Sequence, residues 1–261
     1  MKKGIFITVR TNSSRLPNKA LMKICGKPTI QYAIDRAKQS SCADVIVLCT
    51  STSNNDDALC EIAHKNGIEC FRGSLIDKID RWLQAALEYK VDYFVNIDGD
   101  DLFCEPELID MAFEQHDKED HDFVKCDEEN LVVGAFTLGA KTTAIQKVCD
   151  IKDTEDTEAA WLYFSDMDIF KTSLLENVPE SYNRPDIRAT LDYYDDFLFF
   201  SNIIEYFGAQ KKSRFSLLDV VKYVDENPRV LDINRNCQQE YLNNQQKLTK
   251  LIVKKEYNER A

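Results

Sequence analysis

Apolar and amphipathic stretches alternate along the first half of the chain. Residues 4–9 form an almost unbroken apolar run rich in Ile, Phe and Val, which is typical of a strand buried on both faces of a sheet. By the same reasoning, we expect strands over 43–51, 68–71 and 92–97 and helices over 29–40, 55–67, 77–90 and 105–118. Strands separated by helices of this length indicate right-handed crossovers and a mainly parallel sheet.

The pattern is looser in the second half of the chain. Two strands are expected over 122–126 and 131–140 with only an acidic turn between them, which predicts a hairpin or a mixed-sheet excursion. The remaining expected elements are a helix over 141–151, a short strand leading into a helix over 188–208, and helices over 216–228 and 238–258. We therefore expect one α/β domain over 1–261, with a variable acceptor-side insertion around 119–187 and a helical C-terminal segment at 238–258.

Charge and cysteine content limit the classes of partner and compartment. The 33 Lys and Arg residues against 45 Asp and Glu residues give a net charge of −12. Such a chain repels nucleic acid and anionic membranes in bulk, so we expect neither partner, and any anion site must be a local basic patch. The nine cysteines are scattered with no CxxC pair, which favours buried thiols in a reducing, cytoplasmic setting.

Charged clusters follow three apolar runs, at the strand ends where ligands of an open parallel sheet bind. The members are Arg10, Arg15 and Lys19 after the first strand, Asp98, Asp100 and Asp101 after the strand at 92–97, and Asp192, Asp195 and Asp196 after residues 188–191. Carboxylates on two loops suit Mg²⁺, which takes one or two of them together with phosphate oxygens, while the cations neutralise the phosphates. The pattern predicts a nucleoside triphosphate site without a Walker sequence, although each cluster alone is also compatible with surface charges or a turn.

The stretch "RTNSSRLPNKAL", followed by "ICGKPTIQYAIDRAK", resembles the opening signature of the bacterial cytidylyltransferases. These include the enzymes that make CMP-activated 3-deoxy sugar acids and the spore coat polysaccharide F-type relatives. Three later stretches, "FRGSLIDKIDRWLQAA", "VNIDGDDLFCEPELID" and "IRATLDYYDDFLFF", resemble further segments of the family in the same order. A fourth, "FSLLDVVKYVDENPRVLDIN", resembles the segment that closes the F-type relatives, so the likeness runs through 4–235.

The resemblance implies a Rossmann-like nucleotidyltransferase (GT-A-like) fold with a mixed, mainly parallel sheet flanked by helices. It implies Mg²⁺-dependent transfer of CMP from CTP to an acceptor, with release of pyrophosphate. The residues that it assigns to CTP binding are Thr8, Val9, Arg10, Ser14, Arg15, Lys19, Arg72 and Asp98. Asp100 and Asp192 are the implied metal ligands, and with Arg15 and Lys19 they form the expected catalytic set.

The acceptor is predicted from departures from the family pattern. Enzymes for the eight-carbon sugar acid carry Gln-Gly-Asp-Glu-Pro where this chain has Asp-Gly-Asp-Asp-Leu at 98–102, and their acceptor-segment His and Arg are absent from "EAAWLYFSDMDIF". A sugar hydroxyl needs a general base, whereas a phosphate oxygen is already anionic. We therefore favour a small acidic, phosphorylated acceptor such as the phosphoglutamine of capsule phosphoramidate biosynthesis, with a nonulosonic or 3-deoxy sugar acid as the alternative. Arg72, Arg184 and Arg188 are the expected acceptor-binding residues.

Other interpretations of the pattern stay open. A non-catalytic nucleotide-binding protein has little need of two carboxylates at separate strand ends. A sugar-1-phosphate nucleotidyltransferase that uses GTP or UTP typically opens with a more glycine-rich loop than this chain has. A homodimer is possible through an apolar stripe of the tail, made of Tyr241, Leu248, Leu251 and Ile252.

Overall fold

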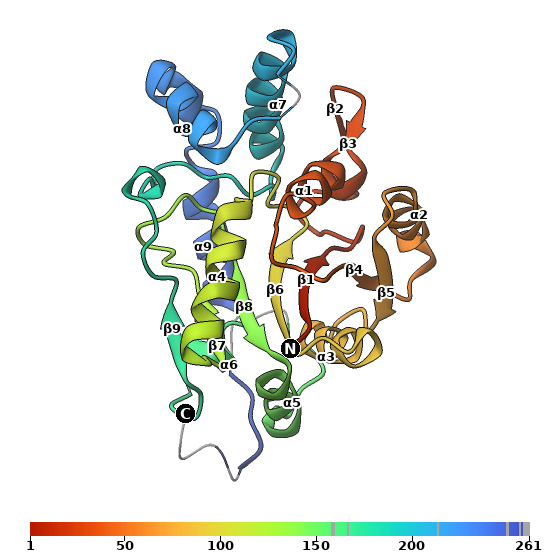
Figure 1. Ribbon diagram of the computed structural model, residues 1–261. Coiled ribbons are helices and arrows are strands. Elements are labelled where there is room, and N and C mark those ends of the chain that lie inside the picture. The colour runs from red at the N-terminus through yellow and green to blue at the C-terminus, as the bar shows by residue number, and fades with distance from the viewer. Residues whose placement is uncertain (158–159, 166, 213, 249–250, 256, 258–261) are drawn as a thin grey trace.

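A seven-stranded sheet in the order β5-β4-β1-β6-β8-β7-β9 forms the centre of the molecule (Figure 1). The computed structural model describes residues 1–157, 160–165, 167–212, 214–248, 251–255 and 257. The strands are β1 (Lys3–Thr8), β4 (Val45–Ser51), β5 (Glu69–Gly73), β6 (Tyr93–Asp98), β7 (Phe123–Lys125), β8 (Leu138–Lys141) and β9 (Thr172–Leu174). A separate small hairpin pairs β2 (Lys23–Ile24) with β3 (Lys27–Pro28).

The sheet is mixed and mainly parallel, which confirms the expected fold class. Strands β5, β4, β1 and β6 run parallel, and β8 is antiparallel to both β6 and β7. Strand β9 pairs parallel with β7 at the edge, so strands from 123–174 extend the same sheet. The excursion that the sequence predicted is therefore the pairing of β7 with β8.

Helices cover both faces of the sheet. They are α1 (Thr29–Ala37), α2 (Asp57–Lys65), α3 (Lys78–Tyr89), α4 (Pro106–Glu119), α5 (Thr142–Ile151), α6 (Leu162–Ser165), α7 (Tyr194–Ala209), α8 (Leu217–Glu226) and α9 (Cys237–Leu248). Because side chains alternate along a strand, Ile5 and Ile7 of β1 pack into one apolar core and Phe6 into another. The first core contains buried residues of α1, α2, α4, α7 and α8, and the second contains residues of α3, α5 and α6.

Two expected strands are not formed as the pattern suggested. Residues 131–137 form no regular strand, although most of them are buried, because the chain turns sharply at Gly134. Gly134 has a φ of +86°, and a Cβ there would lie 2.4 Å from the Ala189 carbonyl oxygen, so the position requires glycine. Residues 188–191 make only a single bridge, between Arg188 and Val133, before α7 begins.

The C-terminal segment is helical over a shorter range than 238–258. Helix α9 ends at Leu248, and positions 249, 250, 256 and 258 lie outside the described residues. Among the described residues that follow, 251–254 are not helical: Val253 bridges to Lys152, and the Ile252 carbonyl accepts a hydrogen bond from Tyr163 at 2.8 Å. Leu251 packs against the second core, so this part of the expected dimer stripe is used within the chain.

Two further observations bear on the sequence expectations. All nine cysteines are free; Cys49, Cys104 and Cys237 are buried and Cys25 is exposed, so the expectation of buried thiols holds for part of the set. In the described part of the chain, no helix has both the length and the apolar character needed to cross a membrane.

Candidate active site

The site lies where β1 and β6 end side by side. The two strands pair in register up to Thr8 and Asp98, and the Gly99 amide donates to the Thr8 carbonyl at 2.9 Å. A Cβ at Gly99 would lie 2.6 Å from the Val9 Cβ. Only glycine therefore allows the segments that follow β1 and β6 to pack this closely. This end of the sheet is the upper one in Figure 1, where α1 and α7 also lie. The loop after β1 is thereby held beside the Asp-rich turn after β6.

Four of the predicted residues meet at this edge. The Lys19 ammonium donates to an oxygen of Asp100 and, at 2.9 Å, to Oδ1 of Asp192. The Arg15 guanidinium donates to the same Oδ1 of Asp192. Since these residues come from three loops far apart in the sequence, the fold brings together the cations and carboxylates that the sequence placed at separate strand ends.

Asp192 is held from behind by a second layer of contacts. Arg188 donates through Nη2 to Oδ2 of Asp192 at 2.8 Å and through Nε to Asp196 at 3.1 Å. Asp196 also accepts from the Asp192 amide at 3.0 Å and from Asn234 at 3.0 Å. The Arg188 and Asp192 side chains are only 4% and 3% exposed, so this arrangement is fixed in the protein interior.

The pKa directions follow from burial and from these pairs. Burial alone would raise the pKa of Asp192, but Lys19 and Arg15 hold it well below its ordinary range. Burial raises the pKa of Asp100, and the charges of Asp192 and Asp98 add to that rise against the opposing effect of Lys19. Burial would likewise lower the pKa of Lys19, but the two carboxylates raise it above the usual lysine value. These directions favour a charged Lys19 and an ionised Asp192.

The loop between β1 and Lys19 is anchored by a residue that the sequence did not assign to the site. Asp56, at the start of α2, accepts from the Thr11 amide at 2.8 Å and from the Thr11 hydroxyl at 2.7 Å. The Asn18 amide donates to the Thr11 carbonyl at 3.1 Å, which closes the intervening loop. Ser14 and Arg15 lie on the exposed part of this loop, with their polar groups accessible to a ligand.

The comparison with protein families decides the identity of this arrangement. The cytidylyltransferase family model matches residues 5–248, which is most of the chain. The chain belongs to the cytidylyltransferase family. It is therefore a nucleotidyltransferase enzyme rather than a non-catalytic nucleotide-binding protein.

Individual relatives agree with the family match. A Methanocaldococcus jannaschii protein of uncharacterized function is 30% identical over 235 residues, covering 89% of this chain and 94% of that protein. The spore coat polysaccharide biosynthesis protein SpsF of Bacillus subtilis is 24% identical over 227 residues, covering 85% and 93%. A solved cytidylyltransferase structure from Leptospira borgpetersenii superposes with a TM-score of 0.78 at 26% identity, covering 88% and 97%.

Asp98 of this cytidylyltransferase is paired with a cation that sequence reasoning missed. Lys78, at the start of α3, donates to Asp98 at 2.8 Å and lies 5.0 Å from the Trp82 ring. Thr8, which the sequence assigned to CTP, has its hydroxyl buried between Trp82 and Asn96. The motif "DKIDRW" contained the signal for Lys78, since a lysine in the first turn of a helix is unusual unless it has an anionic partner.

Three other predicted arginines have partners outside the central cluster. Arg10 donates to the Leu75 carbonyl. Arg72 donates to the Ser51 and Ser53 carbonyls at 3.0 and 2.7 Å and to Asp57 at 2.6 Å, so it clasps the loop after β4. Arg184 pairs with Asp186 and Asp225. Arg72 and Arg184 are both partly exposed and bound to exposed carboxylates.

Helix α9 supplies a wall of the site that the sequence did not predict. The Tyr241 ring lies 5.4 Å from the Arg15 guanidinium and 5.3 Å from that of Arg188, within cation–π range of both. Gln238 accepts from Nη1 of Arg188. Tyr241 is partly buried, and its ring lies against these two cations of the same chain.

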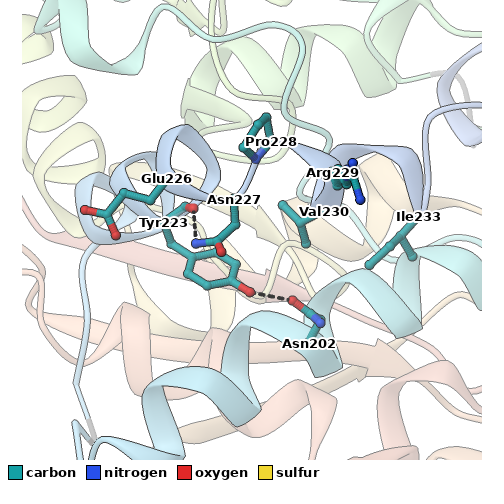
Figure 2. Close-up of a pocket in the computed structure, with 8 residues that line it drawn as sticks. All are labelled: Asn202, Tyr223, Glu226, Asn227, Pro228, Arg229, Val230 and Ile233. Atoms are coloured by element: carbon teal, nitrogen blue, oxygen red, sulfur yellow. Dashed lines mark hydrogen bonds between the residues drawn. The ribbon is translucent and has the colours of Figure 1, made fainter.

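The described residues enclose two notable hollows, and only one of them adjoins the site. One, of about 480 Å³, is formed by α7, α8 and the turn after α8; Figure 2 shows Tyr223 bonded to Asn202 on one side and Val230 and Ile233 on the other. The second, of about 340 Å³, includes Arg188 and Gln238 in its lining and so adjoins the Asp192 cluster. The first hollow shares none of the predicted site residues.

The residues fit a hard divalent cation that is completed by a substrate. Asp100 and Asp192 offer only oxygen ligands and lie close enough to share one ammonium group. Within the described residues, no group of three or more His, Cys, Asp or Glu could hold a metal by itself. Mg²⁺ commonly takes one or two carboxylates and fills its other positions with phosphate oxygens and water, so two acids and a triphosphate suffice.

Proposed function

We propose that this cytidylyltransferase transfers CMP from CTP to a small acidic acceptor and releases pyrophosphate. One observation carries the proposal: Lys19 and Arg15 contact Asp100 and Asp192 at the joined ends of β1 and β6. The cations supply countercharge for a triphosphate, and the carboxylates supply ligands for a metal. A protein that only binds a sugar has no need of this combination.

The proposed reaction is mostly a problem of charge and position. The acceptor oxygen attacks the α-phosphorus of CTP, the bond from that phosphorus to the bridging oxygen breaks, and pyrophosphate leaves with the electron pair. Arg15 and Lys19 bind phosphate oxygens, and Ser14 with the amides of the exposed loop completes the cradle. Thr8, Val9, Arg10 and Asp98 are the further proposed CTP contacts, since they border the same loop or the end of β6. Fixed charges and orientation of this kind supply most of the acceleration in phosphoryl transfer.

Asp100 and Asp192 are the proposed ligands of Mg²⁺. When bound, the cation supplies neutralising charge for the phosphates during transfer. Arg188 and Asp196 keep Asp192 oriented toward the site from the buried side. The Asp100 side chain is 21% exposed and faces the substrate side more openly.

The proposed acceptor is a phosphorylated metabolite such as phosphoglutamine, used in the cytoplasm for a cell-surface polysaccharide such as a capsule. The name of the Bacillus subtilis relative, a spore coat polysaccharide protein, supports the general pathway class. The phosphate preference rests on chemistry: Asp98 is paired with Lys78, so it is poorly suited to deprotonate a sugar hydroxyl. Arg72 and Arg184 are the proposed acceptor residues, since their carboxylate partners are exposed and displaceable, whereas Arg188 is buried against Asp192 and Asp196.

A pyrophosphate-release assay tests the proposal. The purified enzyme is incubated with Mg²⁺, each of the four nucleoside triphosphates, and a panel of phosphorylated amino acids, polyol phosphates and sugar acids. We expect release with CTP and a phosphorylated acceptor, and a CDP-type diphosphate in the product mass spectrum. If a CMP ester of a sugar acid forms faster than any diphosphate, the acceptor is a sugar acid and the assignment as a cytidylyltransferase still holds. Release with GTP or UTP in preference to CTP would contradict the nucleotide assignment.

A further inference from the structure

We propose that Lys19 and Arg15 are internal counter-ions that keep a divalent cation off Asp100 and Asp192 until the phosphates of CTP draw them away. In this view CTP creates the metal site, and metal and nucleotide bind with strong positive cooperativity. The inference rests on the proposed function, because it takes Asp100 and Asp192 as the metal ligands. It goes further, because it pairs Lys19 and Arg15 with the two carboxylates before CTP binds and with the phosphates of CTP afterwards.

Three of the four carboxylate oxygens of Asp100 and Asp192 already accept hydrogen bonds from cations. Lys19 takes one oxygen of Asp100, and Lys19 and Arg15 together take Oδ1 of Asp192. Arg188 takes the remaining oxygen, Oδ2, at 2.8 Å. Asp192 thus faces three cations, and an added metal ion would meet their charges at ion-pair distance.

The second support is the location of the Lys19 ammonium. It bridges Asp100 and Asp192, the two acids that would hold the divalent ion. The Lys19 side chain is only 12% exposed, so water screens this charge weakly. A metal ion and this ammonium therefore compete for the same two acids.

The third support is that the cations differ in their freedom to leave. The Arg15 side chain is 33% exposed and the Lys19 side chain 12%, and both cations are bonded to Asp192, a group that they would exchange for phosphate. Arg188 is 4% exposed and tied also to Asp196 and Gln238. When Lys19 and Arg15 exchange carboxylates for phosphate oxygens, Arg188 remains and holds Asp192 in place for the metal. Each ion pair that Lys19 or Arg15 loses with a carboxylate is replaced by one with a phosphate, so the exchange changes the free energy little. The freed carboxylates can then bind the metal, which couples metal binding to CTP binding.

Binding of Mn²⁺ alone, measured by isothermal titration calorimetry without nucleotide, tests the inference on the full chain. The variants are Lys19→Met and a matched control, Lys152→Met, whose side chain is also 12% exposed and pairs with buried Asp77 elsewhere. We expect weak Mn²⁺ binding by the wild type and by the control, and binding at least about tenfold tighter by Lys19→Met, because a neighbouring positive charge is gone. The same variant should lose CTP affinity.

A second variant and a second measurement guard against misfolding. Arg15→Met removes a more exposed cation and should tighten Mn²⁺ binding in the same direction but by less. In the wild type, Mn²⁺ should raise the affinity for CTP by the same factor by which CTP raises that for Mn²⁺. Free Mn²⁺ binding as weak in both variants as in the wild type would overturn the inference and leave the proposed function intact. Absence of metal binding in the wild type even with CTP would instead remove the metal assignment of the proposed function.

Discussion

Replacing Asp100 and Asp192 by asparagine should separate a catalytic role from a structural one. The Asp192 side chain is 3% exposed and balances Arg15, Lys19 and Arg188, so its amide leaves buried cations without a partner. Removing one partner of a buried ion pair costs about 3–5 kcal/mol, which is a large share of a total stability of about 5–15 kcal/mol. Asp100 is 21% exposed, contacts one of these cations and is repelled by Asp192, so its amide should cost less than about 1 kcal/mol.

Both variants should nevertheless lose turnover to a similar degree. Each removes one of the two proposed metal carboxylates, which should cost on the order of 3 kcal/mol of transition-state stabilisation, or about a hundredfold in rate. Pyrophosphate release at saturating Mg²⁺ measures the rates, and urea unfolding at pH 7.5 measures the stabilities.

The two readouts can fail independently. A near-normal rate for either variant at saturating Mg²⁺ would refute the metal assignment. Equal losses of unfolding free energy in the two variants would refute the argument from burial, because burial predicts a larger loss for Asp192→Asn than for Asp100→Asn.

Three further predictions concern neighbouring residues. Arg15→Ala should weaken CTP binding at least about tenfold and acceptor binding little, since its charge faces phosphates present in every turnover; calorimetry with each ligand checks this. Asp101→Asn should raise the thermal midpoint at pH 7.5, because burial and the charge of Asp100 raise the pKa of Asp101 and its ionised form is disfavoured in the fold. The gain in thermal midpoint should be full above the raised pKa of Asp101 and vanish as the pH falls below the ordinary aspartate value near 3.8. A thermal midpoint that changes with pH in the same way in the wild type and in Asp101→Asn would contradict this prediction. Tyr241→Leu should keep the fold but lower kcat by loosening Arg15 and Arg188, whereas Tyr241→Phe, which keeps the ring, should retain the wild-type rate.

The parallel half of the sheet was predictable because its signal is local. Runs of β-branched and aromatic residues alternate with amphipathic helices, and each crossover must be right-handed. The order of the strands was not predicted, and it is the observed pairing of β1 with β6 that places the loop carrying Lys19 near Asp100. The sequence pattern put Asp192 in a charged cluster after an apolar run, and the resemblance to cytidylyltransferases added its role as a metal ligand together with Asp100.

The rest of the site depends on contacts that span most of the chain. Arg15 and Asp192 are 177 residues apart, and Lys19 and Asp100 are 81 apart. Arg188 had a plausible role as an acceptor residue, but the structure shows it bound to two carboxylates in the interior. Tyr241 was assigned to a dimer stripe because helical spacing shows which residues share a face but not what covers that face.

Loop geometry was the other source of error. The stretch 131–140 is apolar enough for a strand, yet only Leu138–Lys141 forms one. The Gly134 turn allows Glu105 and Ala189 backbone amides to bond to this loop, at the Ala135 and Val133 carbonyls. Those bonds replace the ladder of a strand and bring Ala189 against Asp101 and the end of β6, a tertiary requirement that overrides the local preference.

The balance of charge at the site explains how a chain with a net charge of −12 can bind a triphosphate. Arg15, Lys19 and Arg188 face Asp100, Asp192 and Asp196, so the cluster sums to zero when all six groups are charged. A neutral cluster avoids the self-repulsion that unpaired cations would suffer in a poorly hydrated site. A divalent ion bound to the acids would make the net charge of the cluster positive. A triphosphate that arrives with the ion is attracted by that positive charge, and Lys19 and Arg15, released from the acids, can bind the triphosphate. Attraction for anions would then be confined to metal-bound nucleotides, which is the selectivity that an acidic cytidylyltransferase requires.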